Sequence, residues 1–194
     1  MKSAAIFLAD GFEEIEALAT VDILRRGGIP CTTIGVNGPV STGSHGIPVT
    51  CDAVLEGPSL PGYDMIILPG GMPGAAHLRD DERVQTIIRT YDADPDKYVA
   101  AICAAPMALA AAGITKGRRV TSYPADEFKA YFGDADYVDD ELVVVDGHLI
   151  TSRGPATAFL FAYTLTDLLG GDSKPLMQSM LVNMAAAKIR TMDI

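Results

Sequence analysis

The chain has 194 residues, a length that suits one α/β domain, and its 48% content of hydrophobic residues excludes a disordered chain. A formal net charge of −10 disfavours nucleic acid or an anionic membrane as a partner. No apolar run reaches the ~18–20 residues that a membrane span needs, and three cysteines without a CxxC pair fit a reducing compartment. We therefore expect one cytoplasmic domain over residues 1–194.

The first part of the sequence alternates between predicted strands and helices. Ser3–Ala9 is a nearly continuous apolar run that predicts a buried strand. It is too short for a signal peptide, and an acidic helical pattern over Glu13–Gly28 follows at once. Pro30–Val36 favours a second strand, and the Gly-, Ser- and Pro-rich stretch up to Asp52 predicts short irregular strands.

The same alternation continues beyond residue 60. Asp146-Gly147 is a strong turn signal that predicts a β-hairpin within Tyr137–Ile150, and Gly170-Gly171 fits the end of a long helix. Strands that alternate with helices predict a mostly parallel sheet covered on both faces. The other predicted elements are a strand at Tyr63–Leu68 and helices at Val84–Tyr91, Ala156–Leu169 and, amphipathic, from about Pro175 to Met184.

The segment Val99–Leu109 places a cysteine at a predicted strand-to-helix turn. An apolar run ends at Ile102, and an alanine-rich helical pattern follows Cys103 directly. This order resembles a nucleophile elbow at the C-terminal edge of a parallel sheet, where open α/β folds place their chemistry. The positive end of the helix dipole is expected to lower the pKa of Cys103. The alternative is a small cysteine that only packs the end of the strand.

Two glycine-rich loops, Pro69-Gly70-Gly71 and Ser152–Pro155, also follow predicted strands. Both loops should therefore lie at the same sheet edge as Cys103. Glycine lets backbone N–H groups approach a ligand closely, so the N–H groups of Gly71 and Ala104 can form an oxyanion hole beside the sulfur. The alternative is that these loops are ordinary turns.

Three glutamates, Glu13, Glu14 and Glu16, open the first predicted helix. Acidic residues in a first turn usually stabilise the helix dipole from the surface. Glu16 has apolar neighbours, however, and a protonated carboxyl that reached the sheet edge could donate a hydrogen bond to a thiolate. The spacing alone leaves the choice among the three open.

The histidines and the other cysteines give weaker signals. A Cys–His pair is the usual way to activate a thiol, but nothing in the pattern forces a histidine towards Cys103, and surface positions are the favoured interpretation for His45, His77 and His148. Cys31 and Cys51 fit small residues in or near strands. No spacing of Cys and His predicts a metal site.

Four motifs, in order and spread over nearly the whole chain, resemble the DJ-1/ThiJ/PfpI superfamily and most closely its DJ-1/YajL branch. The motifs are Leu8–Glu16, Leu68–Gly71, Ala100–Pro106 and Thr151–Thr157. The resemblance implies a flavodoxin-like three-layer sandwich that works as a homodimer. It also implies that Cys103 is an oxidation-prone nucleophile, that Glu16 is its protonated partner, and that Gly71 and Ala104 are the backbone donors. The pocket implied by the resemblance includes Gly70, Tyr123, Arg26, His45 and Pro155, and the resemblance places Arg26 and Pro155 near both the pocket and the dimer interface.

Two departures from the family pattern bear on chemistry. The DJ-1 branch often has a histidine in a Thr-x-His-Pro context, where this chain has Tyr123 followed by Pro124. A phenol with a pKa near ~10 is a poor proton shuttle at neutral pH, although it still donates a hydrogen bond. The protease-like branch has a histidine directly after the cysteine, and Ala104 removes that base. The later His-x-Glu pair of glutamine amidotransferases is absent at His148.

The resemblance implies a role in oxidative or carbonyl stress, with a small aldehyde or peroxide as the partner of Cys103. One hypothesis is a glutathione-independent glyoxalase or deglycase that needs no cofactor and no metal. The other is a redox sensor with a protective or chaperone role and no turnover. The alternatives are a cysteine hydrolase or peptidase of the PfpI type and a thiazole-monophosphate biosynthesis protein, as members are often labelled.

Overall fold

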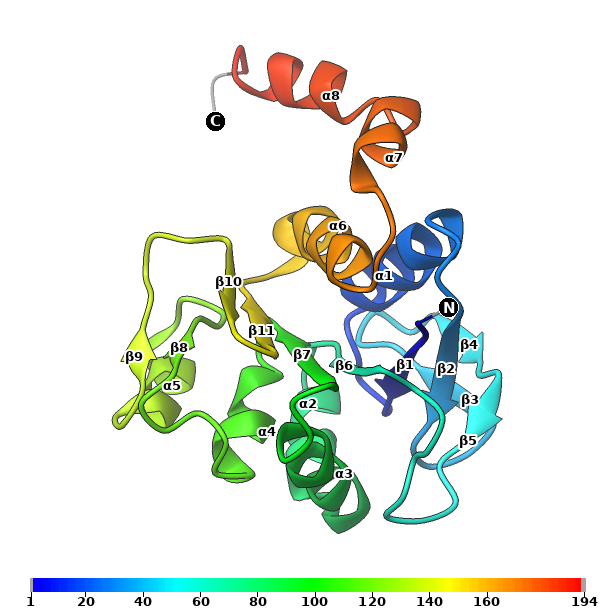
Figure 1. Ribbon diagram of the computed structural model, residues 1–194, viewed down its shortest axis with the longest axis vertical. Helices are drawn as coiled ribbons and strands as arrows, with labels where there is room; N and C mark the ends of the chain where they lie inside the picture. Colours follow the sequence, from blue (N-terminus) through cyan, green and yellow to red (C-terminus); the bar gives the residue numbers. More distant parts are fainter. Residues whose placement is uncertain (1, 193–194) are drawn as a thin grey trace.

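A computed structural model describes residues 2–192 and contains one central sheet with helices on both faces (Figure 1). Every neighbouring pair of strands in this sheet is parallel except β10 and β11, which form the hairpin predicted around Asp146-Gly147. The strands run in the order β10 (Val143–Asp146), β11 (Leu149–Ser152), β7 (Tyr98–Ile102), β6 (Met65–Leu68), β1 (Ala4–Leu8), β2 (Cys31–Gly35) and β5 (Ala53–Val54).

Five of the six parallel strands, in the order β2-β1-β6-β7-β11, have the flavodoxin-like arrangement, in which the chain starts near the middle and is wound outwards in both directions. This confirms the predicted fold class. Two small sheets lie outside the central one: β3 (Val40–Thr42) pairs with β4 (Pro48–Thr50), and β8 (Arg119–Val120) pairs with β9 (Asp136–Tyr137).

The helices form the two outer layers (Figure 1). Helices α1 (Glu14–Arg26) and α6 (Ala158–Leu168) pack together on one face, and α2 (Gly74–Asp80), α3 (Glu82–Asp92) and α4 (Pro106–Ala111) pack on the other. A 3-10 turn at Pro155–Thr157 precedes α6, and the short α5 (Asp126–Lys129) leads into a second 3-10 turn at Ala130–Phe132. No helix within residues 2–192 is long and apolar enough to cross a membrane.

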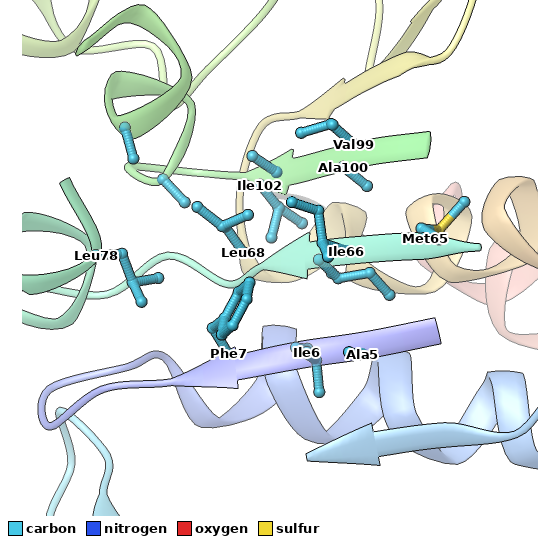
Figure 2. Packing of buried hydrophobic residues seen from close by; sticks show 14 of the residues in the cluster. Ala5, Ile6, Phe7, Met65, Ile66, Leu68, Leu78, Val99, Ala100 and Ile102 are labelled. Carbon is cyan, nitrogen blue, oxygen red and sulfur yellow. The ribbon is translucent and has the colours of Figure 1, made fainter. Parts of the chain in front are cut away.

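The core lies between the sheet and these layers (Figure 2). Strands β1 and β6 are buried along their whole length because helices cover both of their faces, which is why they read as continuous apolar runs. Figure 2 shows Phe7 and Leu68 from neighbouring strands directed towards Leu78 of α2. Helix α2 is not among the elements predicted from the sequence.

The C-terminal helix differs from its prediction. The chain forms two helices, α7 (Ser173–Ser179) and α8 (Val182–Ile189), instead of one from Pro175 to Met184. Leu181 between them has a left-handed backbone with φ of 59°, which ends the helical hydrogen-bonding pattern. Helix α7 packs against α6, whereas α8 has no buried residue and projects from the body (Figure 1). The tail beyond Asn183 is described as far as Met192, and residues 193–194 lie outside the described part.

Candidate active site

Cys103 lies on the predicted turn between β7 and α4. Its backbone has φ of 64°, the left-handed region that a residue with a side chain rarely adopts. Hydrogen bonds fix the turn from both sides: the Cys103 N–H donates to the Ser152 carbonyl at 3.0 Å, and the Cys103 carbonyl accepts from the Tyr123 N–H at 2.8 Å. The nucleophile-elbow geometry predicted from the sequence is therefore confirmed, and the strained backbone is held by two neighbouring segments.

Glu16 is the glutamate that reaches this thiol. Its side chain is completely buried, and its Oε2 accepts a hydrogen bond from the Gly70 N–H at 2.8 Å. Oε1 has no hydrogen-bond partner within the described residues, and the Cys103 thiol lies close enough to this carboxyl to lower its pKa. The structure thus identifies Glu16, rather than Glu13 or Glu14, as the glutamate next to the thiol, a choice that the spacing in the sequence left open.

The other two glutamates hold the start of α1. The Glu13 carboxylate accepts from the Glu16 N–H at 2.7 Å, which caps the helix and orients its first turn. Glu14 pairs with the exposed His45 ring at 2.8 Å and also accepts from the His45 N–H. Burial alone would raise the pKa of Glu14. The hydrogen bonds from His45 and from other backbone N–H groups outweigh this effect and lower the pKa to about 2.

The pKa values of Cys103 and Glu16 depend on each other, and that of Cys103 differs from the sequence-based prediction. Burial raises the pKa of Glu16 to about 7, against the lowering effect of hydrogen bonds from Cys103 and Gly70. Burial, and then the negative charge of Glu16, also raise the pKa of Cys103, while the N–H groups of Ala104 and Gly71 lower it. The predicted low pKa of Cys103 is therefore wrong for this geometry.

The physical reason is the burial of the thiol next to the Glu16 carboxyl, which the helix after Cys103 does not offset. Helix α4 has six residues and begins at Pro106, three residues after Cys103, so its dipole is small and displaced from the sulfur. The carboxylate of Glu16, with a pKa near neutrality, is instead suited to accept the thiol proton as a general base. Because the two groups are coupled, the titration belongs to the pair and not to either side chain alone.

The glycine loop Gly70-Gly71 meets the elbow as predicted. A Cβ at Gly70 would lie 2.6 Å from both the Cys103 Cβ and the Glu16 Oε2, so only a glycine fits between the two reactive groups. Gly71 has φ of 87°, and its N–H is directed at the sulfur together with that of Ala104. These two donors, and the buried carboxyl, surround the atom that would react.

The loop after β11 and the segment of Tyr123 both adjoin the backbone of Cys103. Gly154 follows Ser152, whose carbonyl binds Cys103, and a Cβ on Gly154 would lie 3.5 Å from the Tyr123 ring. Pro155 comes next and is half-buried. Phe128 on α5 is not among the site residues predicted from the sequence, and its ring meets Tyr123 edge-on with 6.0 Å between the ring centroids.

Two residues that the resemblance assigns to the pocket lie elsewhere. Arg26 is the last residue of α1, about 15 Å along the helix from Glu16, and its exposed side chain pairs with Asp22. His45 is exposed at the connection between β3 and β4, where it contacts Glu14 rather than Cys103.

The remaining histidines and cysteines also lie outside the site. His77 is exposed on α2, as expected, with its Nδ1 3.0 Å from the Asp10 carbonyl. The expected exposure of His148 is wrong: it is half-buried, with its Nε2 3.0 Å from Asp92, a partner 56 residues away that local patterning does not reveal. Cys31 and Cys51 are buried free thiols at strand β2 and after β4, as expected.

Among residues 2–192, one group of potential metal ligands comes together at Glu13, Glu14 and His45, with ligand atoms within 4.8 Å of one another. Both carboxylates already accept backbone N–H groups, and Glu14 binds the His45 ring. These hydrogen bonds account for the grouping without a cation.

A parallel α/β sheet with a cysteine on a left-handed strand-to-helix turn, and a buried carboxyl against the thiol, defines a cysteine-elbow α/β protein. A model of the DJ-1/PfpI family matches residues 2–168. Protein dj-1beta of Drosophila melanogaster is 38% identical over 89% of this chain and 92% of its own length. The glutathione-independent glyoxalase DJR-1.2 of Caenorhabditis elegans is 35% identical over 89% and 91%. The chain belongs to the DJ-1/PfpI family.

A solved structure agrees with this assignment. The crystal structure of Drosophila melanogaster DJ-1beta superposes with a TM-score of 0.87 at 37% identity, covering 93% of this chain and 97% of that one. The likeness extends beyond one motif to the whole sandwich and supports the DJ-1-like fold deduced from strand order.

Proposed function

We propose that this DJ-1-like protein protects against carbonyl and oxidative stress through Cys103, and that its reaction is the cofactor-free conversion of a 2-oxoaldehyde to a 2-hydroxy acid. The observation that carries the proposal is the buried Glu16 carboxyl, with a pKa of about 7, against a thiol that also faces two backbone N–H groups. The naming of a Caenorhabditis elegans relative as a glutathione-independent glyoxalase supports it.

In the proposed reaction, the Cys103 sulfur bonds to the aldehyde carbon while the Glu16 carboxylate takes the thiol proton. The oxygen of the resulting hemithioacetal faces the N–H groups of Gly71 and Ala104 and receives that proton. Glu16 then removes the hydrogen of the former aldehyde carbon as a proton and returns it to the adjacent carbon, while the hydroxyl proton of the hemithioacetal passes to the former ketone oxygen. The product is a thioester, which water cleaves to the hydroxy acid and the free thiol.

The same groups also support a redox role, which is the second candidate function. A peroxide would oxidise Cys103 to a sulfenate and a second peroxide would give the sulfinate, with one water released at each step. Protonated Glu16 and the N–H groups of Gly71 and Ala104 offer hydrogen bonds to the added oxygens. A peptidase is disfavoured because Ala104 stands where a base is needed, and no residue supports thiazole biosynthesis.

We further propose a homodimer. Apolar side chains are exposed on the face formed by α1 and α6: Ile15 and Leu18 on α1, and Phe159 and Leu160 on α6. Exposed apolar side chains on two helices that pack together favour association with a second copy. Three free cysteines fit work in the cytoplasm.

The decisive assay is lactate formation from methylglyoxal without glutathione, by the wild-type protein beside Cys103→Ser. We expect steady turnover that is lost at least 100-fold in the variant, because the serine hydroxyl is a much weaker nucleophile than the thiol. Turnover equal in both proteins contradicts the glyoxalase proposal. Formation of a Cys103 sulfinate by dilute peroxide would then leave the redox role as the function.

Tyr123 is expected to limit the rate with methylglyoxal. Tyr123→His supplies a side chain whose pKa lies near neutrality and that can move a proton at the reacting oxygen. We expect a several-fold rise in kcat for lactate formation. An unchanged kcat at pH 6–8 would show that proton transfer at this position does not limit the reaction.

A further inference from the structure

Tyr123 carries an exposed aromatic ring at a position tied to the cysteine elbow. Its N–H binds the Cys103 carbonyl at 2.8 Å, so its backbone is fixed relative to the elbow. Tyr123 is 43% exposed, whereas Cys103 is only 9% exposed. The ring is therefore open to an incoming molecule on a segment that is bonded directly to the elbow.

Two neighbours hold the ring in one orientation. The buried Phe128 of α5 meets it edge-on, with an interplanar angle of 85° and 6.0 Å between centroids. On the other loop, Gly154 lacks a side chain where a Cβ would lie 3.5 Å from the Tyr123 Cδ2. The ring thus packs against the backbone that follows Ser152, whose carbonyl accepts the Cys103 N–H.

We propose that Tyr123 is a specificity-determining residue that selects 2-oxoaldehydes with an aromatic substituent over methylglyoxal. A ring held in place by Phe128 and Gly154 offers a flat partner to an aryl group attached to the carbonyl, at little cost in conformational entropy. A methyl group is too small to use that surface. This inference rests on the proposed function and specifies its substrate class.

The chemistry needs no further reactant. An arylglyoxal and one water give one aryl 2-hydroxy acid: the aldehyde carbon is oxidised to the carboxyl level, the ketone carbon is reduced to the alcohol, and the proton moves between them through Glu16. The substituent does not change bonding at any step, so Tyr123 acts on binding and orientation only.

The test compares kcat/KM for phenylglyoxal, measured as mandelate, with kcat/KM for methylglyoxal, measured as lactate. In Tyr123→Ala we expect the ratio of the two to fall about 3- to 10-fold, the range that one aromatic pair supplies. In Tyr123→Phe the ratio should stay within about 2-fold, because the ring is retained. Tyr131→Ala is the matched control, since Tyr131 is equally exposed but binds Arg79 on α2.

Equal losses with both substrates in Tyr123→Ala would overturn the inference, because they would mean that the ring supports the loop without selecting the substrate. A rise in the ratio would overturn it too, because the ring would then obstruct aryl groups. If the wild-type protein converts either substrate, the proposed glyoxalase function stands even when the substrate ratio overturns this inference.

A second readout keeps the inference testable if no turnover is found. Phenacyl bromide and bromoacetone differ by the same phenyl-for-methyl change, and each forms a C–S bond with Cys103 as bromide leaves. We expect alkylation by phenacyl bromide to be favoured in the wild type and in Tyr123→Phe, and the preference to drop 3- to 10-fold in Tyr123→Ala. Equal preference in all three proteins would contradict the specificity role.

Discussion

Glu16→Gln is expected to make the protein more stable at pH 8, by up to about 3 kcal/mol, and inactive as a glyoxalase. The pKa of Glu16 rises from 4.5 to about 7 on folding because the carboxyl is buried, and each pH unit between these values is worth about 1.4 kcal/mol. The amide keeps an oxygen for the Gly70 N–H but carries no charge. The variant thus removes the cost of a buried carboxylate together with the general base.

The pH dependence of the free energy of unfolding follows from the raised pKa of Glu16. The folded protein holds the Glu16 proton more tightly than the unfolded chain, so stability from this group is full below about pH 4.5, falls as the pH rises to about 7, and is constant above that. Wild type and Glu16→Gln should therefore have similar free energies of unfolding near pH 4.5 and diverge towards pH 8. Urea unfolding at both pH values, at one protein concentration, measures the difference.

The control is Glu127→Gln, at an exposed glutamate of α5. Its difference from the wild type should be small at pH 4.5 and at pH 8. If Glu16→Gln shows no larger difference at pH 8 than at pH 4.5, the carboxyl is not buried in an ionised form and the shared-proton account of the site is wrong. A stabilised but inactive variant would be typical of a functional group that costs stability.

The central sheet could be predicted because its signals are local. Continuous apolar runs marked β1 and β7, Asp146-Gly147 marked the hairpin, and the order of strands and helices implied one edge where strand ends meet. The placement of Cys103 and the Gly70-Gly71 loop at that edge followed from topology alone.

What the sequence missed depends on contacts between distant segments. The Asp92–His148 pair joins residues 56 positions apart on different elements. The pKa of Cys103 depends on how deeply the thiol is buried and on a carboxyl 87 positions earlier in the chain, neither of which the strand-to-helix pattern contains. The break between α7 and α8 falls at Leu181, and no glycine or proline at this position indicates the end of a helix.

Gly71→Ala is expected to destabilise the protein by about 3 kcal/mol or more and to abolish turnover. A left-handed backbone costs about 1–2 kcal/mol for alanine, and Gly71 has φ of 87°. The added Cβ would also lie 2.3 Å from the Glu13 nitrogen and 2.6 Å from the Gly11 oxygen. Both are backbone atoms of the segment that starts α1, so relief requires movement of the loop that aims the Gly71 N–H at Cys103.

Substitutions at two other glycines, Gly113 and Gly133, distinguish the cost of backbone strain from the cost of a steric clash. Gly113 has φ of 80° with nothing within 4 Å of a new Cβ, so Gly113→Ala carries the backbone cost alone, and Gly133, with a helical φ of −62° and equally open space, carries neither. Urea unfolding should therefore rank Gly133→Ala, Gly113→Ala and Gly71→Ala in order of increasing loss. A Gly71→Ala protein as stable as Gly113→Ala would mean that the loop yields freely, and a loop that yields freely could not hold a preorganised donor for the hemithioacetal oxygen.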